Sequence, residues 1–268
     1  MSHFTVAVIS KKYKGTEVGP MLKKYDEDDR STFRDCTEEV INAWELGKST
    51  HGTDINKEDY ENIIEFAEKW FGYDNEGTED EPKFGYHYNP DAKWDWYSIG
   101  GRWRGLLKLK EGVENTDETM KIERKSLWNN EEYEDIDPRA VNYAKIKDID
   151  FTPDKNEYEK AKRFWELYID GESPNNEEEQ EILDRASYRK EYLTRRYKNK
   201  ETYARLTSTF NTFAVLTDDG WFEKGEMGWF GASSETDEEE IAWQENYFKN
   251  FIENADGESY ITIVDCHI

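Results

Sequence analysis

HFTVAVI, at residues 3–9, and SYITIVDCHI, at residues 259–268, decide the fold of this chain. In both stretches apolar and β-branched residues occupy successive positions, so that both faces of each strand are apolar. This pattern is typical of a strand that is buried on both sides. Only a central position in a sheet buries both faces. We therefore predict that the first and last strands are neighbours in one sheet.

Helical patterns surround these strands. Residues 35–46 and 57–70 carry apolar side chains at spacings of three and four, as amphipathic helices do. Thr236 and Glu239 form a capping box before a third helix. We expect these helices to flank the sheet.

Residues 154–206 form a separate helical region. One helical stretch follows Thr152 and Pro153, which suit the start of a helix, and a second runs from residue 177 to 206 after a turn. We interpret the region as a helical hairpin inserted between strands. The sequence therefore predicts an α+β fold with a mixed sheet that contains both terminal strands, built as one domain over residues 1–268.

The composition excludes several classes of protein. With 36 Lys and Arg against 61 Asp and Glu, the formal charge is −25, so we do not expect nucleic acid to bind through the bulk surface. No stretch approaches the ~20 apolar residues of a membrane span, and the first residues do not resemble a signal peptide. Two distant cysteines do not make a disulfide scaffold. We expect a cytoplasmic protein that has no membrane partner and no cofactor.

Tryptophans, a pair of glycines and an arginine lie close together in NPDAKWDWYSIGGRW, residues 89–103. The paired glycines permit positive φ, arginine can bind an anion and indoles can stack on a base, so the stretch predicts a site for a nucleotide-like anion. A structural interpretation is also open: the tryptophans fill the core, and Arg102 pairs with Asp95 over an indole ring. The candidate ligand-binding residues are Trp94, Asp95, Trp96, Gly100, Gly101, Arg102 and Trp103.

The two ends of the chain carry a second candidate set. Asp265 and His267 lie on one face of the last strand, and Cys266 lies on the other. If the terminal strands are neighbours, His3 can join Asp265 and His267 in a metal or acid–base site. The alternative is that these side chains only make hydrogen bonds at the strand ends, and that Cys266 is a small buried apolar residue.

Basic residues gather in the second arm of the hairpin, between residues 185 and 205. Arg189, Arg195 and Arg196 are candidates for contact with a partner protein, with a second copy of the chain or with an anion. The alternative is internal neutralisation, in which the acidic body of the protein draws a basic helix onto itself.

Acidic runs are spread along the chain. DEDD at 26–29, EDE at 79–81, EEEQE at 177–181 and DEEE at 237–240 suggest either a mimic of the phosphates of DNA or a solvated surface that keeps the protein soluble. Loops and helix starts carry most of these runs, and acids are common there in any protein.

Three pieces of the chain together resemble a known family. These pieces are MSHFTV at 1–6, the WDWYSIGGRW centre, and VDCHI at 264–268, which follows FAVLTDDGWFEKGEMGWFG at 213–231. The chain is similar here to uncharacterised proteins of bacteriophages and prophages. The resemblance implies a phage origin and an accessory role, for which the family supplies no assigned activity.

We therefore expect a phage-type accessory protein that binds a host protein in the host cytoplasm and inhibits or redirects it, in takeover of the host or against its defences. The acidity and the lack of a recognised catalytic motif favour this function. The alternative is a binding module or small enzyme that acts on a nucleotide-like anion at the Trp–Gly–Gly–Arg centre. Whether the protein is an enzyme stays open at this point. A carboxylate or histidine beside that centre would favour the enzyme over the binding module.

Overall fold

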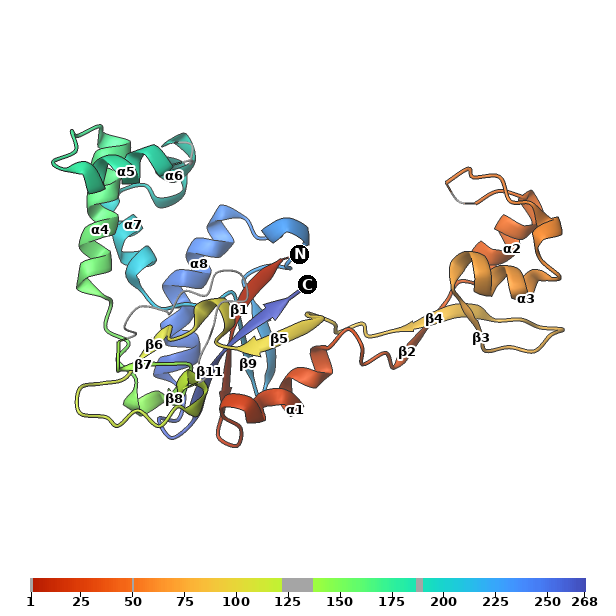
Figure 1. The fold of residues 1–268 in the computed structure, drawn as a ribbon, viewed down its shortest axis with the longest axis horizontal. Coiled ribbons are helices and arrows are strands. Elements are labelled where there is room, and N and C mark those ends of the chain that lie inside the picture. The colour runs from red at the N-terminus through yellow and green to blue at the C-terminus, as the bar shows by residue number, and fades with distance from the viewer. Residues whose placement is uncertain (1, 50, 122–136, 187–189) are drawn as a thin grey trace. The chain divides into compact units, whose positions relative to one another are not determined.

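The computed structural model describes residues 2–49, 51–121, 137–186 and 190–268. It is an α+β protein with one mixed sheet that contains both the N-terminal and the C-terminal strand (Figure 1), as the sequence predicts. The strands of this sheet, in spatial order, are β10 (Gly220–Glu223), β9 (Ala214–Thr217), β1 (His3–Ser10), β11 (Tyr260–His267) and β5 (Trp96–Ile99), and β8 (Tyr143–Lys145) also pairs with β11.

The terminal strands β1 and β11 are direct neighbours, so the prediction of adjacent strands is confirmed. They pair antiparallel over all eight residues, from His3 opposite His267 to Ser10 opposite Tyr260. On its other side β1 pairs parallel with β9, and this makes the sheet mixed.

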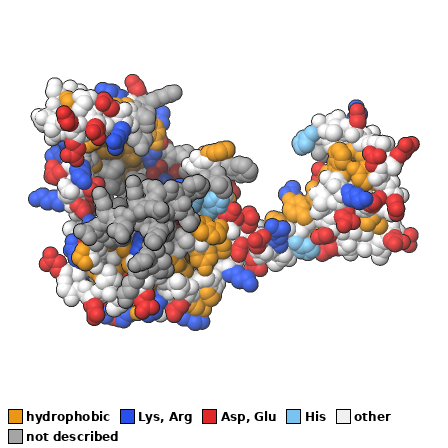
Figure 2. Space-filling model, in the orientation of Figure 1, with side chains coloured by type: hydrophobic (Ala, Val, Ile, Leu, Met, Phe, Trp, Pro, Cys, Tyr) orange, Lys and Arg blue, Asp and Glu red, His pale blue; other side chains and the backbone are white. Residues whose placement is uncertain are grey.

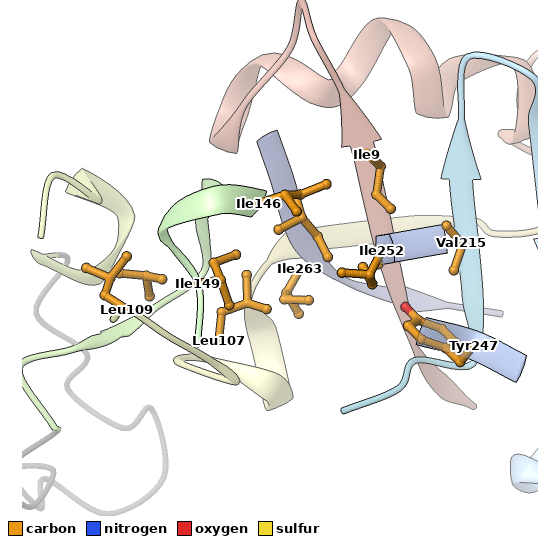
Figure 3. Close-up of a cluster of buried hydrophobic side chains, with 12 residues drawn as sticks. Ile9, Leu107, Leu109, Ile146, Ile149, Val215, Tyr247, Ile252 and Ile263 are labelled. Carbon is orange, nitrogen blue, oxygen red and sulfur yellow. The ribbon is translucent and has the colours of Figure 1, made fainter. Parts of the chain in front are cut away.

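Both faces of these central strands are covered. On one face Ala7, Ile9, Ile261 and Ile263 join a buried cluster that includes Tyr247 (Figure 3). On the other face Val6, Val8 and Val264 are fully buried. The backbone N–H of Gly15 donates to Thr262 Oγ1 at 3.1 Å, which holds the turn before α1 (Gly19–Leu22) on this second face. This two-sided burial explains the uninterrupted apolar pattern of β1.

Contacts within the chain divide it into two compact units. The first contains residues 1–22 and 96–268, and the second contains residues 23–95. Whether both belong to one domain, as the sequence suggests, stays a prediction. The first unit also holds β6 (Leu107–Lys108), β7 (Ala140–Val141) and α8 (Asp237–Tyr247), which starts at the predicted capping box of Thr236 and Glu239.

The second unit has its own sheet and core. Its elements are β2 (Thr32–Asp35), α2 (Thr37–Leu46), α3 (Ile63–Phe66), β3 (Asp74–Asn75) and β4 (Phe84–Tyr88), with strand order β2–β4–β3. Phe66 is fully buried at the centre of this core. The rings of Trp44, Tyr60 and Phe71 lie 5.2 to 5.5 Å from it, centroid to centroid.

Residues 154–206 are helical, but the second arm is not one helix. The helices are α4 (Lys155–Trp165), α5 (Glu177–Arg185), α6 (Lys190–Tyr197) and α7 (Lys200–Ser208). Lys198 has a φ of 67°, and the Asn199 side chain then caps α7 by accepting the N–H of Thr202. This break lets both α6 and α7 contribute to one small core, which contains Trp165, Leu193, Tyr197 and Leu206. In the described ranges no helix is both long and apolar enough to cross a membrane.

We expect Phe66→Ala to destabilise the second unit by ~3–5 kcal/mol, the usual cost of emptying a buried aromatic site. Hydrogen exchange should accelerate across residues 23–95 and stay unchanged in β1 and β11. Leu46→Ala is the control in the same unit: Leu46 is 76% exposed, so the change should stay within ~0.5 kcal/mol. Equal acceleration in both units would show that they unfold together.

Candidate functional site

Segments that lie far apart in the sequence meet at one end of the main sheet. His3 of β1 stands opposite His267 of β11, which stands opposite Trp96 of β5. The backbones of Ser2 and Ile268 exchange two hydrogen bonds of 3.0 Å, so the two ends of the chain lie side by side (Figure 1). We call this place the junction, and define it by Ser2, His3, Trp96, Gly100, Gly101, Arg102, Asp265, His267 and residues 228–231.

A buried carboxylate connects the parts of the junction. Asp265 is 2% exposed. Its Oδ1 lies 2.8 Å from Nδ1 of His3, and its Oδ2 accepts the backbone N–H of Arg102 at 2.9 Å. The ring of His267 lies edge-on to the ring of His3, with a centroid distance of 4.9 Å. The structure therefore brings together His3, Asp265 and His267, as the sequence predicts for neighbouring strands.

The glycine pair of the centre allows this close approach. Gly100 and Gly101 have φ values of 70° and 50°, which favour glycine. A Cβ on Gly101 would lie 2.2 Å from Asp265 Oδ2, and one on Gly100 would lie 2.4 Å from Asn142 Oδ1. The turn thus presents the Arg102 amide to Asp265. That amide is used inside the protein and does not point to an external anion.

Two residues that sequence analysis missed support the same turn. Asn142 is 1% exposed, and its Oδ1 accepts the N–H of Gly105 at 2.9 Å. The backbone N–H of Asn142 donates in turn to Oδ2 of Asp117, a second buried carboxylate, at 2.6 Å. Asp117 also accepts the N–H of Thr119 at 2.8 Å, and Asn142 Nδ2 donates to the Thr119 hydroxyl. Asp117 and Asn142 are polar residues, and nothing in the sequence pattern around them indicates that their side chains are buried.

The tryptophans of the centre belong to both units and differ in their exposure. Trp94 and Asp95 belong to the second unit, where Trp94 is buried and its carbonyl accepts the N–H of Glu27 at 3.0 Å. Trp96 is 53% exposed, whereas Trp103 packs against the main core. Arg102 is exposed. The carboxylate that the first unit brings to this turn is that of Asp265.

Neither Cys266 nor a metal site adds chemistry to the C-terminal strand in the part of the chain that the structure describes. Cys266 faces away from the histidines, is fully buried, and has a thiol pKa that burial raises well above its ordinary value. It therefore behaves as a small apolar residue. Within the described ranges no three His, Cys, Asp or Glu side chains are placed to hold a metal ion.

The loop at residues 228–231 joins the junction through Ser2. Ser2 Oγ donates to the carbonyl of Gly228 at 2.6 Å and accepts the N–H of Gly231 at 2.8 Å. Between these anchors, Phe230 is 87% exposed and has a φ of 60°, which is uncommon outside glycine. The junction therefore displays two large rings, those of Trp96 and Phe230.

The basic arm is matched by acids of the same unit. Arg195 contacts Asp237 at 2.7 Å, and Arg196 pairs with Glu240. Lys200 contacts Glu166 and Arg205 contacts Glu245, both at 2.9 Å. Arg189 lies outside the described residues. Internal neutralisation accounts for these four cations, and a role of Arg195 and Arg196 in partner binding stays a prediction.

In comparisons with known proteins, no family model, no curated protein and no solved structure matches this chain. The chemistry of the junction is therefore the basis on which we propose a function. It combines a buried aspartate that orients an imidazole, an exposed guanidinium, and two exposed aromatic rings. Such a set can bind a protein surface or a ligand, and can move a proton.

We expect Gly101→Ala to lower the free energy of unfolding more than Gly112→Ala. Both positions have positive φ, which costs alanine ~1–2 kcal/mol. A Cβ at Gly112 meets nothing within 4 Å, whereas one at Gly101 meets Asp265. The overlap should add ~1–3 kcal/mol. Urea denaturation of both variants measures the difference, and equal stabilities would contradict the close approach.

A second prediction concerns acid stability of the helical region. Arg163 holds Glu179 with two hydrogen bonds of 3.0 and 2.9 Å, and lowers the pKa of that carboxyl from 4.5 to about 2. A lowered folded-state pKa stabilises the folded form above pH 4.5, and this contribution is lost as the pH falls from 4.5 towards 2. Carboxyl NMR should place the Glu179 midpoint near pH 2. Glu179→Gln should remove that part of the acid dependence, and a midpoint near 4.5 would contradict the pairing.

Proposed function

We propose that this protein is a phage-type accessory protein that binds a host protein through the junction. The exposure of Trp96 and Phe230 carries the proposal. These two large rings stand at the place where the separated motifs meet, and Trp96 is 53% and Phe230 87% exposed.

Exposed aromatic side chains on a rigid backbone suit protein binding. A few Trp, Tyr and Arg residues supply most of the energy in many interfaces. The backbone of Trp96 is fixed by pairing with His267, and the loop of Phe230 is fixed at both ends by Ser2. Little conformational entropy is then lost on binding. The left-handed conformation of Phe230 adds support, because backbone strain clusters at functional sites.

The charge supports a cationic partner. Residues 23–95 hold 9 Lys and Arg against 21 Asp and Glu, a net charge of 9 − 21 = −12 on 73 residues. The other 195 residues carry the remaining −13. Figure 2 shows acidic side chains over the unit that carries α2 and α3. A field of this sign speeds the encounter with a basic protein and repels nucleic acid.

The resemblance to phage proteins supports a host target, and inhibition or redirection of that target is the activity that we propose. The cytoplasm of the host is the proposed location, and both cysteines are unpaired, as in most cytoplasmic proteins. A second candidate function, action on a nucleotide-like anion, is favoured by the contact between Asp265 and His3 beside Arg102.

We expect Trp96→Ala and Phe230→Ala each to weaken binding to the host partner by ~30-fold or more, the scale of an interface hot spot of ~2 kcal/mol. The partner is first identified by quantitative mass spectrometry of material captured from host cells. The affinity tag is inserted after Gly112, where the turn faces open space. Calorimetry with the purified partner then measures the loss.

Phe222→Ala is the matched control. Phe222 is also an exposed aromatic residue, at 40%, but it lies in β10, away from the junction. The Phe222→Ala variant should bind the partner with the affinity of the unchanged protein. A partner that binds all three variants equally would place the interface elsewhere on the protein.

A further inference from the structure

One ring nitrogen at the junction, Nε2 of His3, is available to accept a proton. His3 Nδ1 faces Asp265, and in the described part of the chain His3 Nε2 has no hydrogen-bond partner. The side chain of His3 is 16% exposed.

The hydrogen bonds of Asp265 fix the tautomer of His3. A carboxylate accepts hydrogen bonds, and Asp265 accepts one from the Arg102 N–H through Oδ2. Its Oδ1 therefore accepts a hydrogen bond from His3 Nδ1–H, and Nε2 of the neutral imidazole keeps a lone pair. An aspartate that orients an imidazole in this way is the arrangement that prepares a histidine as a general base.

The junction also carries groups that suit a phosphate and a planar base. Arg102 is exposed one residue beyond the glycine pair, and a guanidinium matches the geometry of a phosphate. Trp96 and His3 flank His267 in the register of the sheet, so the three side chains share one face. An exposed indole on that face can stack on a nucleobase. A long nucleic acid is disfavoured by the charge of −25, which points to a small ligand.

We propose that the junction hydrolyses a small nucleotide phosphodiester, with His3 as the general base. This inference goes beyond partner binding and does not depend on it.

The reaction consumes one water molecule. His3 Nε2 takes a proton from the water, whose oxygen forms a bond to phosphorus. The bond between phosphorus and one ester oxygen breaks, and its electron pair leaves with that oxygen. Solvent protonates the leaving alkoxide and takes the proton from the imidazolium. The products are a phosphomonoester and an alcohol, and no electrons are transferred.

Two probes test the proposal, both in the presence of EDTA so that contaminating metal-dependent nucleases are silent. Bis(p-nitrophenyl) phosphate reports bond cleavage directly, and the dinucleotide ApA adds a base for Trp96 to bind. We expect both to be cleaved, and His3→Gln to lose ~100-fold or more of the rate, since general bases contribute ~10²- to 10⁴-fold. Binding of ApA, measured by calorimetry, should survive His3→Gln.

His87→Gln is the matched control. His87 is also paired with an acid, Glu76 at 3.1 Å, but it lies in the second unit. The His87→Gln variant should cleave both probes at the rate of the unchanged protein. The proposal is overturned if the folded, unchanged protein cleaves neither probe, or if His3→Gln, purified identically, cleaves them at the unchanged rate. Neither result bears on binding to the host partner.

Asp265 is a positioning residue in this scheme, and its test needs a readout besides rate. Asp265→Asn keeps the shape of the side chain but no longer fixes the proton on His3 Nδ1. The ¹⁵N chemical shifts of His3 should show Nδ1–H in the unchanged protein and a mixture of tautomers in the variant. An unchanged tautomer with an unchanged rate would refute the role of Asp265. If the variant does not fold, the ¹⁵N shifts of the unchanged protein decide: a proton on Nε2 would overturn the proposal.

Discussion

The antiparallel pairing of β1 with β11 is the constraint on which the rest of the structure depends. It fixes His3 opposite His267, and the other edge of β11 places His267 opposite Trp96 of β5. It also supplies the central strands on which the two apolar layers pack. Without this pairing neither the main core nor the junction exists, because residues from both ends of the chain contribute to each.

Two buried carboxylates show how the protein stabilises charge near this sheet. Asp265 and Asp117 are each 2% exposed, and in the described part of the chain neither pairs with lysine or arginine. Backbone N–H groups and neighbouring side chains supply their hydrogen bonds instead. A buried carboxylate that lost these donors would be costly. The backbone of the turn at residues 100–105 is therefore tied to Asp265 directly and to Asp117 through Asn142.

The sequence predicted the elements of this fold better than their contacts. The two apolar faces of β1 and β11 are visible in the residue pattern, as is the capping box of α8. The glycine pair indicated a turn with positive φ, but not that Asp265 approaches it, because 163 residues separate Asp265 from Arg102. Asp117 and Asn142 escaped notice because their donors are backbone groups, which have no sequence signature. The helix after residue 177 was expected to continue, yet Asn199, a good N-cap residue, starts a new helix at α7.

The pairing of β1 with β11 also has a consequence for folding during synthesis on the ribosome. β1 is synthesised before its antiparallel partner β11, which begins at Tyr260, about 250 residues further along the chain. At ~5–20 residues per second, β1 waits on the order of ten seconds or more with two apolar faces and an unpaired edge. Such a strand is exposed to aggregation while it waits. Chaperone capture of the nascent β1 is thus a natural companion of this topology, because β1 and β11 can pair only after β11 has been synthesised.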